Sequence, residues 1–120
     1  MARILLAEDD NAMRQWLVKA LVQAGHDVVD CSNGKDALLQ IHKTKNFDLL
    51  LTDIVMPGVD GIELAKRTQG LIPNIKTMFI TGFSGMNVGT SEKDTHTHYT
   101  MAKPFHLRDM VKQVETILNG

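Results

Sequence analysis

Three consecutive acidic residues end the first apolar run of this sequence. Glu8, Asp9 and Asp10 directly follow the apolar residues 4–7 in the stretch ILLAEDDN. Carboxylates held side by side repel and raise one another's pKa, so a cation among them would stabilise the cluster. Oxygen ligands without histidine or cysteine favour Mg²⁺. The stretch therefore predicts a magnesium site, although Asp10 could instead cap the helix that follows.

Three further polar residues stand at the ends of later apolar runs: Asp53 ends LLLTD, Thr81 ends MFIT, and Lys103 follows TMA. If these runs are parallel strands, their carboxyl ends meet along one sheet edge, where open α/β sheets bind ligands. An ammonium and a hydroxyl there could hold the oxygens of an anion on the metal, and Gly82 leaves room for a phosphate. The carboxylate of Asp53 could then be a nucleophile that accepts a phosphoryl group.

Each of these residues taken alone has an ordinary structural explanation. Strand-end acids are commonly solvated, Thr81 could simply finish a strand, and Lys103 could be a surface charge. Their joint occurrence at four strand ends is what favours a phosphoryl-transfer site. His96 and His98 could in principle bind a metal, but solvated loop histidines are the favoured interpretation because no third ligand lies nearby.

Short apolar runs alternate with segments of helical period, which predicts a parallel sheet with helices on both faces. The expected strands cover 3–7, 27–31, 47–53, 77–81 and 99–102. The expected helices cover 11–24, 35–43, 62–69 and a final helix that carries Leu107 to Leu118. The apolar stripe expected on the first helix consists of Met13, Trp16, Leu17, Ala20, Leu21 and Ala24. Between Phe83 and Tyr99 the apolar stripe is weak, so the helix expected there is short or mobile.

Composition narrows the class of protein. The 120 residues predict one domain with no output module, and the net charge of −1 without long blocks of like charge argues against nucleic-acid binding. Cys31 is the only cysteine, which fits the reducing cytosol. No apolar run approaches the roughly 20 residues of a membrane span, and the N-terminus lacks a signal-peptide core. We expect a cytoplasmic protein without membrane insertion.

The sequence resembles the receiver domain of bacterial response regulators over essentially its whole length. The stretches ILLAEDDNAMR, FDLLLTDIVMPGVDGIEL, MFITG and AKPFHLRDMV occur in the family's order, and D-x-x-M-P-x-x-D-G with K-P-F is a specific combination. The resemblance implies an α/β, flavodoxin-like (βα)₅ receiver domain over residues 1–120. Its five-stranded parallel sheet would have the order 2-1-3-4-5, with helices on both faces.

The same resemblance implies the roles of individual residues. Asp53 would be the phosphoacceptor, Thr81 and Lys103 would contact the phosphate, and the Lys103–Pro104 peptide bond would be cis. The implied Mg²⁺ ligands are Asp9, Asp53 and the carbonyl of Val55, with Glu8 acting through water. A histidine kinase or a histidine phosphotransferase would supply the phosphoryl group. The receiver would be no enzyme beyond its own phosphorylation and dephosphorylation, and phosphorylation would shift its conformational population.

Two features depart from the family's pattern. The position three residues before Lys103 usually holds an aromatic residue, but here it is Thr100, and Tyr99 points to the opposite face of the strand. The weak helical pattern between Phe83 and Tyr99 also removes the packed helix that receivers commonly use to dimerise. We therefore expect a monomer.

Within the family, the sequence is similar to single-domain regulators of bacterial cell-cycle proteolysis. This implies an adaptor that primes the ClpXP protease, through ClpX, for selected substrates and that phosphorylation switches off. An apolar partner surface could consist of Tyr99, Thr100, Met101 and Phe105, with ordinary strand and core packing as the alternative. Two other functions stay open: a phosphate shuttle or sink between histidines, and a Mg²⁺-dependent phosphatase. The phosphatase ranks last because no D-x-D-x-T start or nucleotide-binding glycine loop is present.

Overall fold

The computed structural model describes residues 2–82 and 98–120. The expectation of a short or mobile helix between Phe83 and Tyr99 therefore falls almost entirely outside the described residues, as does His96. No helix in the described part of the chain is long and apolar enough to cross a membrane.

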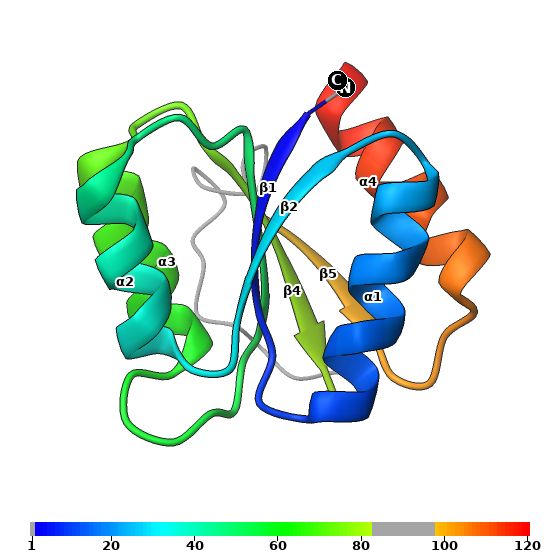
Figure 1. Ribbon diagram of the computed structural model, residues 1–120, viewed down its shortest axis with the longest axis horizontal. Coiled ribbons are helices and arrows are strands. Elements are labelled where there is room, and N and C mark those ends of the chain that lie inside the picture. The colour runs from blue at the N-terminus through cyan, green and yellow to red at the C-terminus, as the bar shows by residue number, and fades with distance from the viewer. Residues whose placement is uncertain (1, 83–97) are drawn as a thin grey trace.

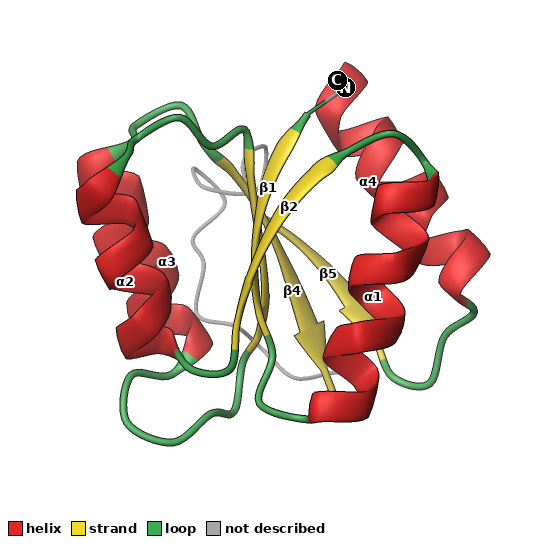
Figure 2. Ribbon diagram, in the orientation of Figure 1, coloured by secondary structure: helices red, strands yellow, loops and turns green. Residues whose placement is uncertain are grey.

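Five parallel strands form one sheet in the order β2-β1-β3-β4-β5, which confirms the expected topology (Figures 1 and 2). The strands are β1 (Arg3–Ala7), β2 (Asp27–Cys31), β3 (Leu49–Asp53), β4 (Lys76–Thr81) and β5 (His98–Ala102). The register pairs Ala7 of β1 with Thr52 of β3, and Asp53 of β3 with Ile80 of β4. These pairings bring the carboxyl ends of the three central strands to one edge of the sheet.

Four described helices cover the two faces of the sheet. They are α1 (Asn11–Gln23), α2 (Gly34–Lys43), α3 (Gly61–Leu71) and α4 (Leu107–Asn119). In Figure 1, α2 and α3 lie on the left face, and α1 and α4 lie on the right face. Helices on both faces explain why every residue of β3 is buried and why its sequence reads as a continuous apolar run.

Side chains of successive strand residues enter different halves of the core. Leu5 and Leu50 pack with residues of α2 and α3, whereas Leu6 and Leu51 pack with residues of α1 and α4. This alternation follows from the twofold period of a strand. Both sets are fully buried, so the sheet forms a rigid base for the residues at its edge.

Short polar side chains set where three of the helices begin. Asp10 accepts a hydrogen bond from the main-chain N–H of Met13 at 3.0 Å, which confirms it as the cap of α1. Asn33 and Asp60 cap α2 and α3 in the same way. These caps begin both helices one residue earlier than expected, because the cap leaves the next residue helical.

The prediction that Trp16 belongs to the buried stripe of α1 is wrong. Its side chain is 62% exposed, whereas Leu17 and Leu21 are fully buried. Trp16 lies about 100° around the helix from Leu17 and so at the border of the apolar face. There it lines an open groove with Leu107 and Val111 of α4, which leaves most of the indole exposed. Ala24, at the other end of the expected stripe, is also exposed.

Candidate functional site

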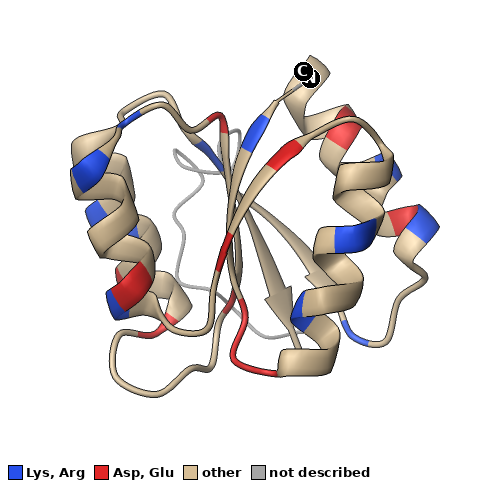
Figure 3. Ribbon diagram, viewed as in Figure 1, with Lys and Arg blue, Asp and Glu red and all other residues tan. Residues whose placement is uncertain are grey.

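The predicted site residues meet at the carboxyl edge of the sheet. Glu8 and Asp9 directly follow β1, Asp53 ends β3, Thr81 ends β4, and Lys103 directly follows β5. Figure 3 shows the acidic stretch after β1 at the lower end of the sheet. Parallel pairing therefore places the carboxylates, the hydroxyl and the ammonium at one edge, as the sequence predicts.

Lys103 bridges two of the carboxylates. Its Nζ lies 3.2 Å from Asp53 Oδ2 and 3.5 Å from Glu8 Oε1. The main-chain N–H of Lys103 donates to the carbonyl of Thr81 at 2.7 Å, so the end of β4 holds the start of the loop that carries the ammonium. The Lys103–Pro104 peptide bond is cis.

Burial of Glu8 dominates the electrostatics of the site. Its side chain has no solvent exposure, and this burial raises its pKa from 4.5 to about 7. A hydrogen bond from the main-chain N–H of Asp10, at 3.1 Å, opposes the rise, and the charge of Asp53 adds to it. Burial lowers the pKa of Lys103, but the carboxylates of Glu8 and Asp53 outweigh burial and raise it. Lys103 therefore stays charged, whereas Glu8 is held close to protonation.

The donor set fits a divalent cation. One carboxylate oxygen from each of Glu8, Asp9 and Asp53 lies within 4.8 Å of the other two. Glu8 Oε1 is buried, makes no hydrogen bond within the described residues, and faces the Lys103 ammonium at 3.5 Å. Three oxygens and no sulfur or nitrogen are the ligand chemistry of Mg²⁺. Val55 lies two residues after Asp53 in the loop that follows β3, and its side chain is exposed.

Close main-chain packing fixes the loop after Asp53. A Cβ atom on Gly61 would collide with the carbonyl oxygen of Asp53, and one on Gly34 would lie 2.5 Å from the carbonyl oxygen of Val59. Gly58 has a φ of 75°, the positive value that a type II turn with Pro57 and Gly58 at its central positions requires of the second. The hydroxyl of Thr52 also donates to the carbonyl of Asp53 at 2.8 Å. Hence the loop closes tightly against the strand end that presents Asp53.

Thr81 is buried at the end of the neighbouring strand, directly after the residue that pairs with Asp53. A Cβ atom built on Gly82 would meet no atom within 4 Å. The described residues therefore leave open space beside Gly82, in keeping with the room that the sequence predicts for an incoming phosphate.

The four residues of the predicted partner surface are not equally accessible. Thr100 is exposed, whereas Tyr99, Met101 and Phe105 are partly buried and pack against the core that α1 and α4 cover. Thr100 pairs with Phe79 and faces the opposite half of the core from Tyr99. The three apolar side chains thus have a packing role whether or not a partner binds them.

Sequence reasoning missed Arg14, which contacts the main chain of the acidic turn. Its Nη1 donates to the carbonyl of Glu8 at 2.8 Å. A signal was present, because Arg14 stands in the first turn of α1, where the helix dipole disfavours a cation. A cation at such a position calls for a specific partner.

Comparison with known proteins identifies the class. A family model described as the response regulator receiver domain matches residues 4–115, so the chain belongs to the receiver domain family. The response regulator receiver protein CpdR of Brucella abortus is 49% identical over 98% of both chains. The sporulation initiation phosphotransferase F of Bacillus subtilis is 31% identical over 92% of this chain and 91% of its own. The crystal structure of the receiver domain of the hybrid histidine kinase CckA matches with a TM-score of 0.82 at 28% identity, over 97% of this chain and 98% of its own.

Proposed function

We propose that this receiver is phosphorylated on Asp53 with Mg²⁺ and that phosphorylation switches its binding to a partner protein. The observation that carries the proposal is the contact of Lys103 Nζ with both Asp53 and Glu8 at the carboxyl edge of the sheet. A partly buried ammonium beside a strand-end carboxylate suits a group that acquires negative charge. The receiver family supports the same chemistry.

In the proposed reaction, a carboxylate oxygen of Asp53 attacks the phosphorus of a phosphohistidine on a histidine kinase or histidine phosphotransferase. A P–O bond forms to give an acyl phosphate, the P–N bond breaks, and the imidazole leaves with its electron pair and takes up a proton. Mg²⁺, held by Glu8, Asp9, Asp53 and the carbonyl of Val55, would neutralise charge on the phosphoryl oxygens. Lys103 and Thr81 would bind the same oxygens by charge and hydrogen bonding.

Intact mass after incubation with phosphoramidate tests the proposal. The wild type should gain one phosphoryl group with Mg²⁺ and none with EDTA, whereas Asp53→Asn should gain none. Glu63→Gln, which alters an exposed carboxyl group on α3, is the matched control and should behave as the wild type. A phosphoryl group on Asp53→Asn would place the modification elsewhere and contradict the assignment.

We further propose that the chain works in the cytoplasm as an adaptor for ClpXP proteolysis in cell-cycle control. The 49% identity to CpdR over 98% of both chains supports this output. Since Asp53→Asn mimics the unphosphorylated state, a pull-down with ClpX should retain this variant and lose the phosphorylated wild type. Equal retention of both forms would contradict a phosphorylation-controlled adaptor.

A phosphate shuttle or sink is the second candidate. The similarity to a phosphotransferase over 91% of that protein's length favours it. A shuttle should pass a radiolabelled phosphoryl group from Asp53 to a histidine phosphotransferase and should not bind ClpX. Transfer without ClpX binding would favour the shuttle, whereas ClpX binding would favour the adaptor.

A further inference from the structure

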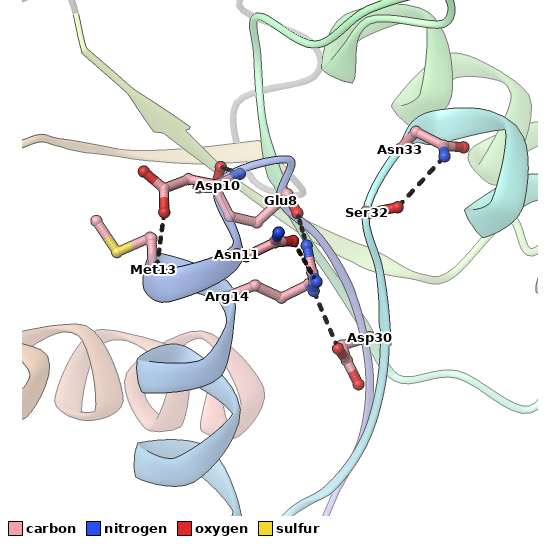
Figure 4. Close-up of polar contacts among 8 residues, drawn as sticks. All are labelled: Glu8, Asp10, Asn11, Met13, Arg14, Asp30, Ser32 and Asn33. Atoms are coloured by element: carbon pink, nitrogen blue, oxygen red, sulfur yellow. Dashed lines mark hydrogen bonds and ion pairs between the residues drawn. The ribbon is translucent and has the colours of Figure 1, made fainter.

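Arg14 binds three segments that meet at the acidic turn, although it is not a predicted metal ligand (Figure 4). Its Nη1 donates to the main-chain carbonyl of Glu8 at 2.8 Å, and its Nη2 donates to Asn11 Oδ1 at 2.7 Å. Its Nε lies 3.2 Å from Asp30 Oδ2 on β2. One guanidinium therefore ties the end of β1 to the start of α1 and to the neighbouring strand.

This arrangement differs from an ordinary surface ion pair. The side chain of Arg14 is 15% exposed, whereas that of Arg67, which pairs with Glu63 one helical turn away, is 57% exposed. A planar guanidinium presents its donors in a fixed fork, so three directed contacts restrain the position of each acceptor. One of these acceptors is the main chain of Glu8, the residue directly before Asp9.

The charge of Arg14 alone would oppose a cation at this turn. Its positive charge repels a divalent ion nearby, so any benefit to metal binding has to come from geometry. We propose that Arg14 is a positioning residue that holds the acidic turn so that Glu8 and Asp9 converge with Asp53 on one Mg²⁺. This inference rests on the proposed function.

Arg14→Lys separates geometry from charge. The variant keeps the positive charge and the long apolar stem but loses the fork of donors. Calorimetric titration of the metal-free protein with MgCl₂ should show a Kd about tenfold higher than that of the wild type, the size typical of groups that orient metal ligands. The phosphorylation rate with phosphoramidate at saturating Mg²⁺ should stay within about twofold of the wild type, since Arg14 contacts no reacting atom.

Two more variants complete the test. Asn11→Ala removes one partner of the guanidinium without any change of charge and should raise the Kd by a smaller factor. Arg14→Met should also weaken Mg²⁺ binding, whereas a pure charge effect predicts tighter binding in Arg14→Met and no change in Arg14→Lys. Arg67→Lys is the matched control on α3, and its Kd should equal that of the wild type.

The outcomes separate this inference from the proposed function. An unchanged Kd in both Arg14→Lys and Asn11→Ala, with normal binding by the wild type, overturns the role of Arg14 and leaves the proposed function standing. A wild type that binds no Mg²⁺ overturns both. If circular dichroism shows that Arg14→Lys does not fold, the Kd of Asn11→Ala decides the question.

Discussion

Replacing Glu8 with glutamine should stabilise the metal-free protein, and the gain should grow with pH. Glu8 is fully buried, and the Lys103 ammonium, which lies 3.5 Å from its carboxylate, is shared with Asp53. Burial raises the pKa of Glu8 from 4.5 to about 7. A difference of this size between the folded and unfolded states corresponds to about 3 kcal/mol.

The direction of the effect follows from proton binding. A raised pKa means that the folded protein holds the proton more tightly than the unfolded chain does. The contribution of Glu8 to the free energy of unfolding is therefore fully present below pH 4.5 and is lost as the pH rises to about 7. Glutamine does not ionise, so Glu8→Gln avoids this loss. The substitution also removes one of the two carboxylates that contact Lys103, which makes the gain smaller. We therefore expect the free energy of unfolding to rise by about 1–3 kcal/mol at pH 8 and to change little near pH 5.

Urea unfolding followed by circular dichroism in EDTA, at several pH values between about 5 and 8, measures this difference. Glu63→Gln, an exposed acid on α3, is the control and should change the free energy of unfolding by less than about 0.5 kcal/mol. Added Mg²⁺ should stabilise the wild type more than Glu8→Gln, because the variant lacks the negative charge of one of the proposed carboxylate ligands. The reasoning would be refuted if the two proteins differed in free energy of unfolding by the same amount at pH 5 and pH 8. It would also be refuted if Glu8→Gln were less stable than the wild type at pH 8.

Three further predictions concern packing. Gly70 on α3 has open space around the position of a Cβ atom, so Gly70→Ala should raise the free energy of unfolding by about 0.5–1 kcal/mol. A Cβ atom on Gly61 would collide with the carbonyl of Asp53, so Gly61→Ala should lower the free energy of unfolding by more than about 2 kcal/mol in the same urea assay. Burial raises the pKa of Cys31 to about 11, so iodoacetamide at pH 8 should alkylate it at least about tenfold more slowly in the folded than in the urea-unfolded protein, and faster as the pH rises; equal rates would contradict its burial. Trp16 is the only tryptophan and is 62% exposed, so acrylamide should quench its fluorescence almost as strongly as that of a free indole; weak quenching would show that something covers it.

The elements of the fold were predictable because each leaves a local signal. Strands covered by helices on both faces bury every side chain, so β3 reads as a continuous apolar run. Asp10, Asn33 and Asp60 each stand where a helix begins, and a short polar side chain is the usual cap. No single apolar segment of the sequence indicates the order of the strands in the sheet. The resemblance to receivers implied that order, and the observed pairing confirms it.

Solvent exposure at the edge of a helix was not predictable. Helical period places Trp16 on the same side of α1 as Leu17, but how far α4 covers that side depends on where α4 docks. The observed groove leaves the indole open between the two helices. A periodic pattern indicates which face of its own helix a side chain lies on. It carries no information on how much of that face a neighbouring helix covers.

The sequence by itself determined which groups could do chemistry, since carboxylates, a hydroxyl and an ammonium stand at four strand ends and parallel strands bring those ends to one edge. Only the tertiary structure decided their environment. The burial that holds Glu8 near protonation, the contact of Lys103 with Glu8 and Asp53, and the contact of Arg14 with Asp30 all depend on residues distant in the chain. Desolvation and hydrogen-bond geometry depend on how complete elements pack against one another, and neither can be read from the spacing of residues along one strand.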